Sequence, residues 1–332
     1  MPGLKTIYSR DGNPLTDIRA SVARSWLLKD IGQAVFGIAV TSPKCLLEYL
    51  QFGNLLYIQH DTLPDWVGII DTPRVWRNGY VEIYAYEPAL LLKYRYPPVS
   101  YKFTGTPAEK FQMLIDEANE QGDTLIDVEV NTVPGDALEE EFSASVYDCI
   151  ADLCAKYNAE WRTYPLISTA GKLTIGIDFV PRVGIQTDVE LAQGRNILFG
   201  DAPFEENGEL INSLEAITEN SDAAVTSYTH SVEMPYGVRV LRKSFSGVGS
   251  DALSTLAENH VAKSKDPTIS TPLTVIDKGG VFANMSIGNI MKYSYGKIGF
   301  SDGGIGVSRS IRIAGYRFSE AGGTCELFVE NL

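Results

Sequence analysis

The chain has 332 residues, 44% hydrophobic and 21% charged, a composition typical of a globular protein with more than one domain. It carries 42 acidic against 28 basic residues, a net charge of −14, which excludes a nucleic-acid binder that relies on a basic stripe. No apolar run approaches the roughly 20 residues of a membrane span, Met1–Arg10 lacks the apolar core of a signal peptide, and four cysteines are too few for a disulfide framework, so synthesis in a reducing cytoplasm is expected.

The first segment, residues 1–100, is predicted to form a domain built mostly of strands. Two runs rich in β-forming residues, Ser21–Trp26 and Ala34–Val40, flank a turn. A short helix is expected next, because Ser42 suits the N-cap of a helix and Gly53 suits its end.

A hairpin is predicted to complete this segment. Leu55–Ile58 is an apolar run typical of a buried strand. Two further β-rich runs, Gly68–Trp76 and Tyr80–Tyr86, flank Asn78-Gly79. Because Asn and Gly both tolerate positive φ, this dipeptide between apolar runs indicates a tight hairpin turn.

Residues 101–190 are predicted to form a smaller α/β insertion, with two subdomains as an alternative. Thr106 and Glu109 form a capping box, and apolar residues follow at helical spacing. A second helix is expected from Ser145 to Tyr157. Strands are predicted after it at Ala159–Arg162 and Gly171–Ile175.

Residues 191–332 are predicted to form a second β-rich domain with one inserted helix, from about Asp251 to Lys263. The glycine-dense run Gly296–Gly306 predicts a mobile loop. The strands Ile311–Phe318 and Cys325–Val329 are expected to end the domain.

Two short motifs recur in the same order near both ends of the chain. The strand before the second motif carries an arginine in each case, Arg74 or Arg312. The repeated order predicts a duplicated β-barrel, and chance recurrence of glycine turns is the alternative. The pairs are Phe52–Leu56 with Ile287–Met291, and Gly79–Ile83 with Gly323–Leu327.

The segment Gly247–Ala252 matches the pattern G-x-G-x-x-A between a strand-like run and a predicted helix. In dinucleotide-binding proteins such a turn places backbone N–H groups against a pyrophosphate. No second parallel strand with an acid for the ribose follows here, and Asp251 would place a negative charge beside the phosphate. We therefore interpret the segment as a plain strand-to-helix turn and predict no cofactor.

The cysteines and histidines predict neither a metal site nor a catalytic site. Cys149 and Cys154 are spaced more widely than most zinc-binding pairs and lack two further ligands, so packed thiols are favoured. His260 lies on the apolar side of its predicted helix. His60 and His230 are interpreted as surface residues, because no nucleophile or substrate group is evident near them.

Asp136, Glu139, Glu140 and Glu141 form an acidic cluster. Paired carboxylates can hydrolyse glycosides, so a hydrolase is one alternative. The cluster is expected in a loop before a helix, where neighbouring like charges form a solvated face. No G-x-S-x-G or catalytic-cysteine context is present, and no catalytic, cofactor-binding or metal-binding residue is predicted.

The order of these motifs resembles that of the tail-hub (baseplate-hub) proteins of long-tailed bacteriophages, including the siphovirus tail-hub-like family. Members usually carry Gly-Asp where Gly288-Asn289 stands, a conservative departure. The matching segments are Ser21–Val40, Gly53-Asn54 and the Asn-Gly hairpin, Ser145–Asp148, Ala159–Arg162, Gly171–Leu173, Ser231–Glu233, Tyr236–Arg239, Gly288-Asn289 and Arg312-Ile313.

The resemblance implies an α+β, mostly β fold with two related β-barrel domains flanking smaller α/β domains. It also implies a homotrimer, because three chains with two barrels each present six similar surfaces. Such a hub would adapt a six-fold tail tube to a three-fold tail tip and form part of the DNA channel. The implied protein is a non-enzymatic virion component that is made in the host cytoplasm.

The implied partners are the tail tube or distal tail protein ring above the hub and a tail-tip or fibre protein below it. A tape-measure protein in the channel is a further candidate. No membrane and no specific nucleic-acid binding is expected, since an acidic wall would repel DNA as it passes. The alternatives are a tail-tip enzyme that degrades cell wall and a receptor-binding module of the tail tip.

Overall fold

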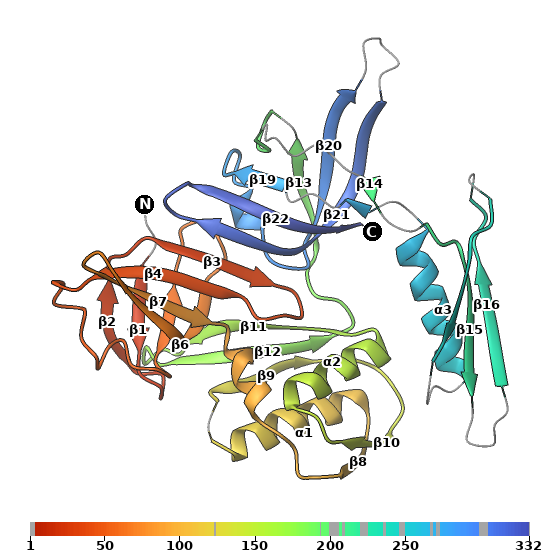
Figure 1. Ribbon diagram of the computed structural model, residues 1–332, viewed down its shortest axis with the longest axis horizontal. Coiled ribbons are helices and arrows are strands. Elements are labelled where there is room, and N and C mark those ends of the chain that lie inside the picture. Colours follow the sequence, from red (N-terminus) through yellow and green to blue (C-terminus); the bar gives the residue numbers. More distant parts are fainter. Residues whose placement is uncertain are drawn as a thin grey trace. The chain divides into compact units, whose positions relative to one another are not determined.

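The computed structural model describes residues 4–122, 124–192, 194–198, 206–207, 210–219, 225–234, 237–245, 250–265, 268–269, 273–298 and 305–331 (Figure 1). The chain divides into two compact units. Unit 1 comprises Met1–Phe199 with Leu273–Phe328, and unit 2 comprises Gly200–Pro272 with Val329–Leu332.

Unit 1 is built on a large sheet to which both ends of the chain contribute. Its strands are β1 (Lys5–Tyr8), β2 (Pro14–Ile18), β3 (Val22–Leu27), β4 (Gln33–Ala39), β5 (Leu55–Ile58), β6 (Trp66–Arg77), β7 (Tyr80–Tyr86), β13 (Gln186–Ala192), β19 (Leu273–Ile276), β20 (Ile290–Ile298), β21 (Ile305–Ser319) and β22 (Thr324–Asn331). The order is β13-β20-β21-β3-β4-β7-β6-β5-β1-β2, and β22 pairs with both β21 and β19 off this path. This order leaves the sheet open, so within the described ranges it does not form the two closed barrels that the sequence predicts.

The predicted strands of the first segment are confirmed. In β3 and β4, buried and exposed side chains alternate, as expected for strands with one face on the core. All four residues of β5 are buried. Between β6 and β7, Asn78 and Gly79 adopt φ values of 46° and 79°, so the predicted turn is confirmed.

The helix predicted between Ser42 and Gly53 is wrong, because this stretch forms isolated turns instead. The buried side chain of Asn54 explains the difference. Its amide nitrogen donates to the carbonyl oxygens of Glu48 and Tyr49, 2.9 and 3.0 Å away. These carbonyls would otherwise accept from the backbone four residues on and continue a helix.

The insertion predicted between residues 101 and 190 contains two helices and two small sheets. Its elements, with the short 3-10 helix that precedes them, are η1 (Pro88–Tyr94), β8 (Tyr101–Gly105), α1 (Pro107–Glu120), β9 (Ile126–Asn131), β10 (Leu138–Phe142), α2 (Val146–Tyr157), β11 (Glu160–Ile167) and β12 (Leu173–Val180). The sheets have the orders β11-β12-β9 and β10-β8. Figure 1 shows α1 and α2 side by side beneath the sheet of β9, β11 and β12.

Local signals determine where both helices of the insertion begin. Thr106 accepts from the backbone N–H of Glu109, whose carboxylate accepts from the N–H of Thr106, and Ser145 caps α2 in a similar way. Such caps stabilise a helix by about 1 kcal/mol. In the core, the ring of Phe111 from α1 stacks on that of Phe179 from β12, with centroids 4.4 Å apart.

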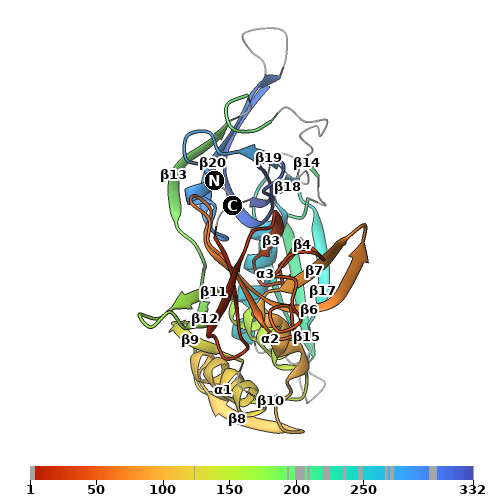
Figure 2. The ribbon, with the colours of Figure 1, turned by 90° about the vertical axis from the view of Figure 1, so that its left-hand side faces the viewer.

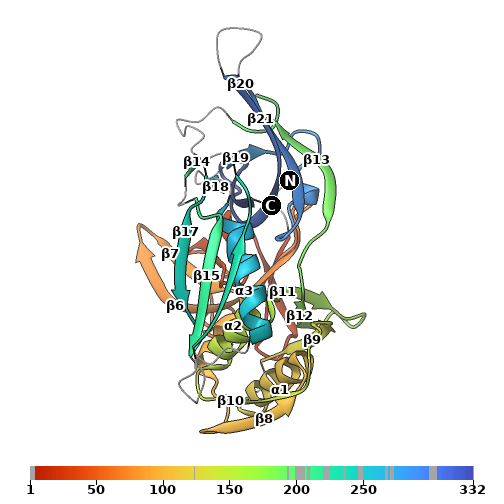
Figure 3. The same ribbon diagram turned by 90° about the vertical axis from the view of Figure 1, so that its right-hand side faces the viewer.

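Unit 2 contains a three-stranded sheet covered by one helix (Figure 3) and a two-stranded sheet of β14 and β18. Its elements are β14 (Glu206–Asn207), β15 (Ser213–Glu219), β16 (Val225–Ser231), β17 (Val240–Ser244), α3 (Ser250–Ser264) and β18 (Thr268–Ile269). The sheet has the order β16-β15-β17. Leu214 and Ala216 of β15 pack against Leu253, Ala257 and Val261 of α3, so the predicted helix is confirmed.

Part of the loop predicted at Gly296–Gly306 is strand instead, because β20 continues to Ile298 and β21 begins at Ile305; residues 299–304 lie outside the described ranges. The division of the chain at residues 100 and 190 stays a prediction. Among the described helices, none is long and apolar enough to cross a membrane.

Candidate functional site

The two Gly-Asn motifs form the same backbone corner. In each, the glycine has a positive φ, +93° at Gly53 and +81° at Gly288. The N–H of Gly53 donates to the carbonyl of Ile70, and the N–H of Ile70 donates back to Asn54. Gly288, Asn289 and Ile313 repeat this pair of bonds. The similarity of the two motifs therefore reflects a shared structure.

Four strands around each corner follow the same order. In the N-terminal repeat (β4–β7, residues 33–86), β5 pairs with β6, β6 with β7 and β7 with β4. In the C-terminal repeat (β19–β22, residues 273–331), β20 pairs with β21, β21 with β22 and β22 with β19. Figures 1 and 2 label β4, β6 and β7 of the N-terminal repeat and β19 and β20 of the C-terminal repeat, and Figure 1 also labels β21 and β22. The two repeats therefore correspond in strand order, whereas the duplicated barrel predicted from the two motifs is not confirmed.

The arginines that were expected to match do not occupy equivalent positions. Arg312 pairs with Ile290, the first residue of β20, whereas the residue paired with the first residue of β5 is Ile69. Arg74 lies further along β6 and donates to the carbonyl of Leu50. The presence of an arginine in both strands is thus no sign of common ancestry.

The C-terminal repeat meets the N-terminal strands within unit 1, where β3 lies along the last part of β21. Five residues of β21, Gly315–Ser319, pair with Ala23–Leu27. Next to this ladder, the buried ammonium group of Lys5 lies 2.7 Å from the carboxylate of Glu320. The ring of His60 contacts Phe318 edge-on, with centroids 5.2 Å apart. Segments about 300 residues apart in the sequence therefore form one continuous structure.

A cavity of about 1190 Å³ lies at this junction. Both repeats and the strands β1 and β2 line it, and the charges on its wall have both signs. His60 lies on the wall with its Nδ1 accepting from the N–H groups of Thr62 and Leu63, so Nδ1 carries no proton. Burial, and then the charge of Arg24, lower the pKa of His60. This arrangement holds the loop after β5 in place.

A buried ion pair joins the C-terminal repeat to the insertion. The guanidinium of Arg312 donates to both carboxylate oxygens of Glu160, with the Nη1–Oε1 distance at 2.7 Å, and to the carbonyls of Val183 and Gly288. Burial raises the pKa of Glu160, but the hydrogen bonds from Arg312 and from the Val183 N–H, with the charge of Lys29, lower it overall. The Glu160 carboxyl is thus ionised at neutral pH.

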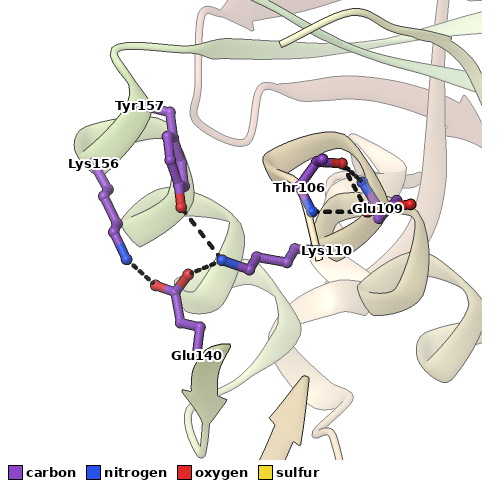
Figure 4. Close-up of polar contacts among 6 residues, drawn as sticks. All are labelled: Thr106, Glu109, Lys110, Glu140, Lys156 and Tyr157. Atoms are coloured by element: carbon purple, nitrogen blue, oxygen red, sulfur yellow. Dashed lines mark hydrogen bonds and ion pairs between the residues drawn. The ribbon is translucent and has the colours of Figure 1, made fainter. Parts of the chain in front are cut away.

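Three residues of the acidic cluster lie on a strand and not in the predicted loop, whereas Asp136 lies in the loop before it. Glu139, Glu140 and Glu141 belong to β10, so successive side chains point to opposite faces. Only Glu140 turns inward. It accepts from the buried Lys110 at 2.9 Å and from Lys156 at 3.2 Å (Figure 4).

The ion pairs of Glu140 fit a structural role better than a catalytic one. Burial raises its pKa, but the hydrogen bonds from Lys110 and Lys156 lower it overall. Lys110 also donates to the hydroxyl of Tyr157 at 3.3 Å, which ties α1, β10 and α2 together. A glycosidase acid needs a raised pKa and a second carboxylate on the other side of the substrate, and Glu139 and Glu141 point away.

Two buried charged groups were not predicted from the sequence. Glu87 is buried among Gly32, Thr163 and Trp26, and burial raises its pKa to about 8 despite the hydrogen bonds that it accepts. Arg24 is buried in the core and donates to the carbonyl of Pro64. Local sequence gives no signal for either, because their surroundings come from distant segments.

The remaining sequence candidates show no reactive arrangement. Cys149 and Cys154 are buried free thiols on α2, and burial raises the pKa of both, that of Cys154 to about 12. His230 and His260 are half-buried in unit 2. Residues 246–249 of the glycine motif lie outside the described ranges. Within these ranges, no cluster of three or more His, Cys, Asp or Glu side chains could hold a metal ion.

Solved structures of tail proteins share this fold over nearly the whole chain. The 43 kDa tail protein of prophage MuSo2 from Shewanella oneidensis matches with a TM-score of 0.64 and 13% identity over 98% of both chains. Prophage tail protein gp18 from Listeria monocytogenes EGD-e matches with a TM-score of 0.61 and 11% identity, over 99% of this chain and 94% of gp18.

A third match lies outside the prophages. The E. coli c3393 protein, a component of the type VI secretion system similar in structure to the T4 bacteriophage tail proteins gp27 and gp5, has a TM-score of 0.54 and 7% identity, over 94% of this chain and 73% of c3393. No protein-family model and no curated protein sequence matches the chain. At such identities the likeness is one of fold, and at that level the predicted resemblance to phage tail proteins is confirmed.

Proposed function

We propose that this chain, which has the fold of phage tail proteins, is a structural component of a phage tail or baseplate, or of a related prophage-derived particle. The proposal is supported by the match to two prophage tail proteins over at least 94% of each of their chains. We further propose that the role is not enzymatic. Lys110 and Lys156 neutralise Glu140, the one inward-facing carboxylate of the acidic cluster, which suits a scaffold.

Within the tail, the proposed role is that of a homotrimeric hub. The observation that carries this step is the repeated four-strand unit, with its two Gly-Asn corners, inside one chain. Three such chains would present six similar units, which suits a three-fold object placed beneath a six-fold tube. In this proposal the repeats are the cores of the two related barrel-like domains, residues 1–100 and 191–332, with the insertion between them.

A hub in this position would form part of the channel through which DNA leaves the particle. The net charge of −14 suits such a wall, because like charge keeps passing DNA from binding to it. The proposed neighbours are the tail tube or distal tail protein ring on one side and a tip or fibre protein on the other. The alternative is that the chain is a cell-wall-degrading or receptor-binding module of the tip.

The size and position of the assembly test this proposal. Light scattering on the purified chain is expected to give about three times its mass of 36.4 kDa. Electron microscopy of particles labelled on this chain is expected to place it between tube and tip. A label on the distal fibres, or a cleared zone when the chain is run in a peptidoglycan gel, would favour the alternatives instead.

A further inference from the structure

The buried guanidinium of Arg24 forms no ion pair with any described residue. Arg24 is 2% exposed and lies on the same buried face of β3 as Val22 and Trp26. Its Nη2 donates to the carbonyl of Pro64 at 2.8 Å. Its Nε and Nη1 have no acceptor among the described residues. A single backbone carbonyl therefore stands against a full positive charge.

The other buried cations show that this arrangement is unusual for the chain. Arginine keeps its charge inside proteins, and a buried charge is normally paired. Each of the other buried cations among the described residues, Lys5, Lys110 and Arg312, lies against a carboxylate. Arg24 departs from this pattern.

The acidic residues in the neighbouring segments have partners of their own. Asp65 lies in the loop between β5 and β6, residues 59–65, and accepts from the hydroxyl of Tyr57 at 2.5 Å. Glu320, directly after β21, lies 2.7 Å from the ammonium group of Lys5. The chain thus supplies no carboxylate to Arg24 within the described ranges, although two lie in adjoining segments.

The hydroxyl of Tyr316 is a second donor on the same buried face. Arg24 pairs with Phe318 and Trp26 pairs with Tyr316, so Tyr316 is the diagonal neighbour of Arg24 across the ladder. Such neighbours are within reach of long and aromatic side chains. The Tyr316 hydroxyl is buried and has no hydrogen-bond partner among the described residues. Burial raises the pKa of Tyr316 and the charge of Arg24 opposes this rise, which places both groups within electrostatic range.

The residues around Arg24 suit a small ligand. On the side away from β21, Arg24 pairs with Ala34, and Ala34 pairs with Ala85 on β7. Both alanines are fully buried, so two of the smallest side chains lie next to the long one of Arg24. On the other side, Phe318 lines the cavity of about 1190 Å³, from which a ligand can enter.

We propose that the Arg24 guanidinium and the Tyr316 hydroxyl bind a small inorganic anion, of the halide class to which chloride belongs. A water molecule would satisfy hydrogen bonds but would leave the charge of Arg24 unbalanced. A phosphate-sized oxyanion presents more acceptor sites than these two side chains can fill. The inference goes beyond the proposed function and does not depend on it.

The bound anion would join three segments that are distant in the sequence. Arg24 belongs to β3, Tyr316 belongs to β21, and the carbonyl of Pro64 fixes the guanidinium to the loop at residues 59–65. An ion that binds the folded chain and not the unfolded one stabilises the fold in proportion to the logarithm of its concentration above Kd. The junction between the C-terminal repeat and the N-terminal strands is then dependent on halide.

Thermal unfolding of the intact chain tests this dependence. Sodium gluconate is replaced stepwise by sodium chloride or bromide at constant ionic strength, so that screening stays the same. The Tm of the wild-type chain is expected to rise with halide concentration. Arg24→Met keeps an apolar stem without the charge and is expected to lose this rise. Arg317→Met, at an exposed guanidinium on the same ladder, is the control and is expected to keep it.

The variant Tyr316→Phe separates binding from packing. Removal of the hydroxyl is expected to raise the halide concentration needed for half of the Tm rise about 10-fold, the usual loss for a hydrogen bond to a charged group. A hydroxyl that only packs in the core would change the Tm by the same amount in gluconate and in halide. That result would remove Tyr316 from the site.

Bromide locates the ion directly. In crystals of the wild-type chain grown with sodium bromide, an anomalous scattering peak is expected within hydrogen-bonding distance of the Arg24 guanidinium. Density there without an anomalous signal would assign the position to water and overturn the proposal. A rise of Tm with halide that persists in Arg24→Met would be a general salt effect and would also overturn it. Should Arg24→Met fail to fold, the bromide crystal decides alone.

Discussion

Asn54 and Asn289 hold the same corner in two stretches of the chain that are 235 residues apart (289 − 54). Each side-chain amide donates to the carbonyl five residues upstream, of Tyr49 in one case and Asn284 in the other. Each backbone carbonyl accepts from an isoleucine of the next strand. Asn289 also accepts from the N–H of Ile185, which joins its corner to the strand leaving the insertion. The same local hydrogen-bond pattern thus forms in two different environments.

The glycine of each corner offers the first prediction. Gly53→Ala is expected to cost about 1 kcal/mol in the free energy of unfolding, the usual penalty for a side chain at positive φ. Gly288→Ala is expected to cost more than about 3 kcal/mol, because its Cβ would overlap the carbonyl of Val183 as well. Urea unfolding of the two variants measures both. Equal losses would show that the second corner is not tightly packed against the insertion.

Short-range signals in the sequence predicted the elements that short-range contacts stabilise. The turn at Asn78-Gly79 and the capping box at Thr106 are examples, since their hydrogen bonds join residues close in sequence. The pairing of β3 with β21 left no such signal, because it joins residues about 290 apart. The burial of Lys110 also left no short-range signal. Its ammonium group is neutralised by Glu140, which belongs to another element of the fold.

Where a tertiary contact competes with a local preference, the sequence-based prediction failed. Ser42 and Gly53 suggested a helix, but Asn54 takes the carbonyls that a helix would use. The acidic run at Glu139–Glu141 suggested a solvated loop, but pairing with β8 makes it a strand.

The buried pair of Arg312 and Glu160 gives the second prediction. Arg312→Ala is expected to cost about 3–5 kcal/mol, because it leaves a buried carboxylate without its partner. The control on the same strand is Arg317→Ala, whose exposed pair with Glu326 is worth at most about 1 kcal/mol. The folded-state pKa of Glu160 is lowered, so the stability from this pair is present above the unfolded-state pKa and is lost as the pH falls through the folded-state value. Unfolding curves between pH 3 and 7 of wild type and Arg312→Ala are expected to converge at the acidic end.

The inward-facing Glu140 gives the third prediction. Glu140→Gln is expected to cost about 3 kcal/mol, because the ammonium of the fully buried Lys110 loses its counter-charge. Glu141→Gln on the same strand, which faces solvent, is expected to change the free energy of unfolding by less than about 0.5 kcal/mol. The double variant Lys110→Met, Glu140→Leu is expected to lose less than Glu140→Gln alone, since it removes both charges. Thermal denaturation of the three variants measures these changes. A double variant that is less stable than Glu140→Gln alone would contradict a purely structural role for the pair.

The buried Glu87 gives the last prediction, a dependence of stability on pH in the alkaline direction. Its carboxyl lies where the turn after β3, the start of η1 and β11 meet, accepting from Gly32 and Thr163. Burial raises its pKa to about 8, above that of an unfolded chain. The stability that Glu87 contributes is therefore complete below about pH 4.5 and is lost as the pH rises through 8. Over this window the free energy of unfolding is expected to fall by at most about 1.4 kcal/mol per pH unit on its account.

The variant Glu87→Gln isolates this dependence. The amide keeps the size and the acceptor oxygen of the side chain but never ionises, so the decline between pH 4.5 and 8 that Glu87 causes is expected to disappear. At pH 9 the variant is then expected to be more stable than the wild-type chain. Glu48→Gln, at an exposed carboxylate, should follow the wild-type curve and serves as the control. Urea unfolding at several pH values measures all three proteins, and parallel curves for wild type and Glu87→Gln would show that this carboxyl ionises as easily in the folded chain as in the unfolded one.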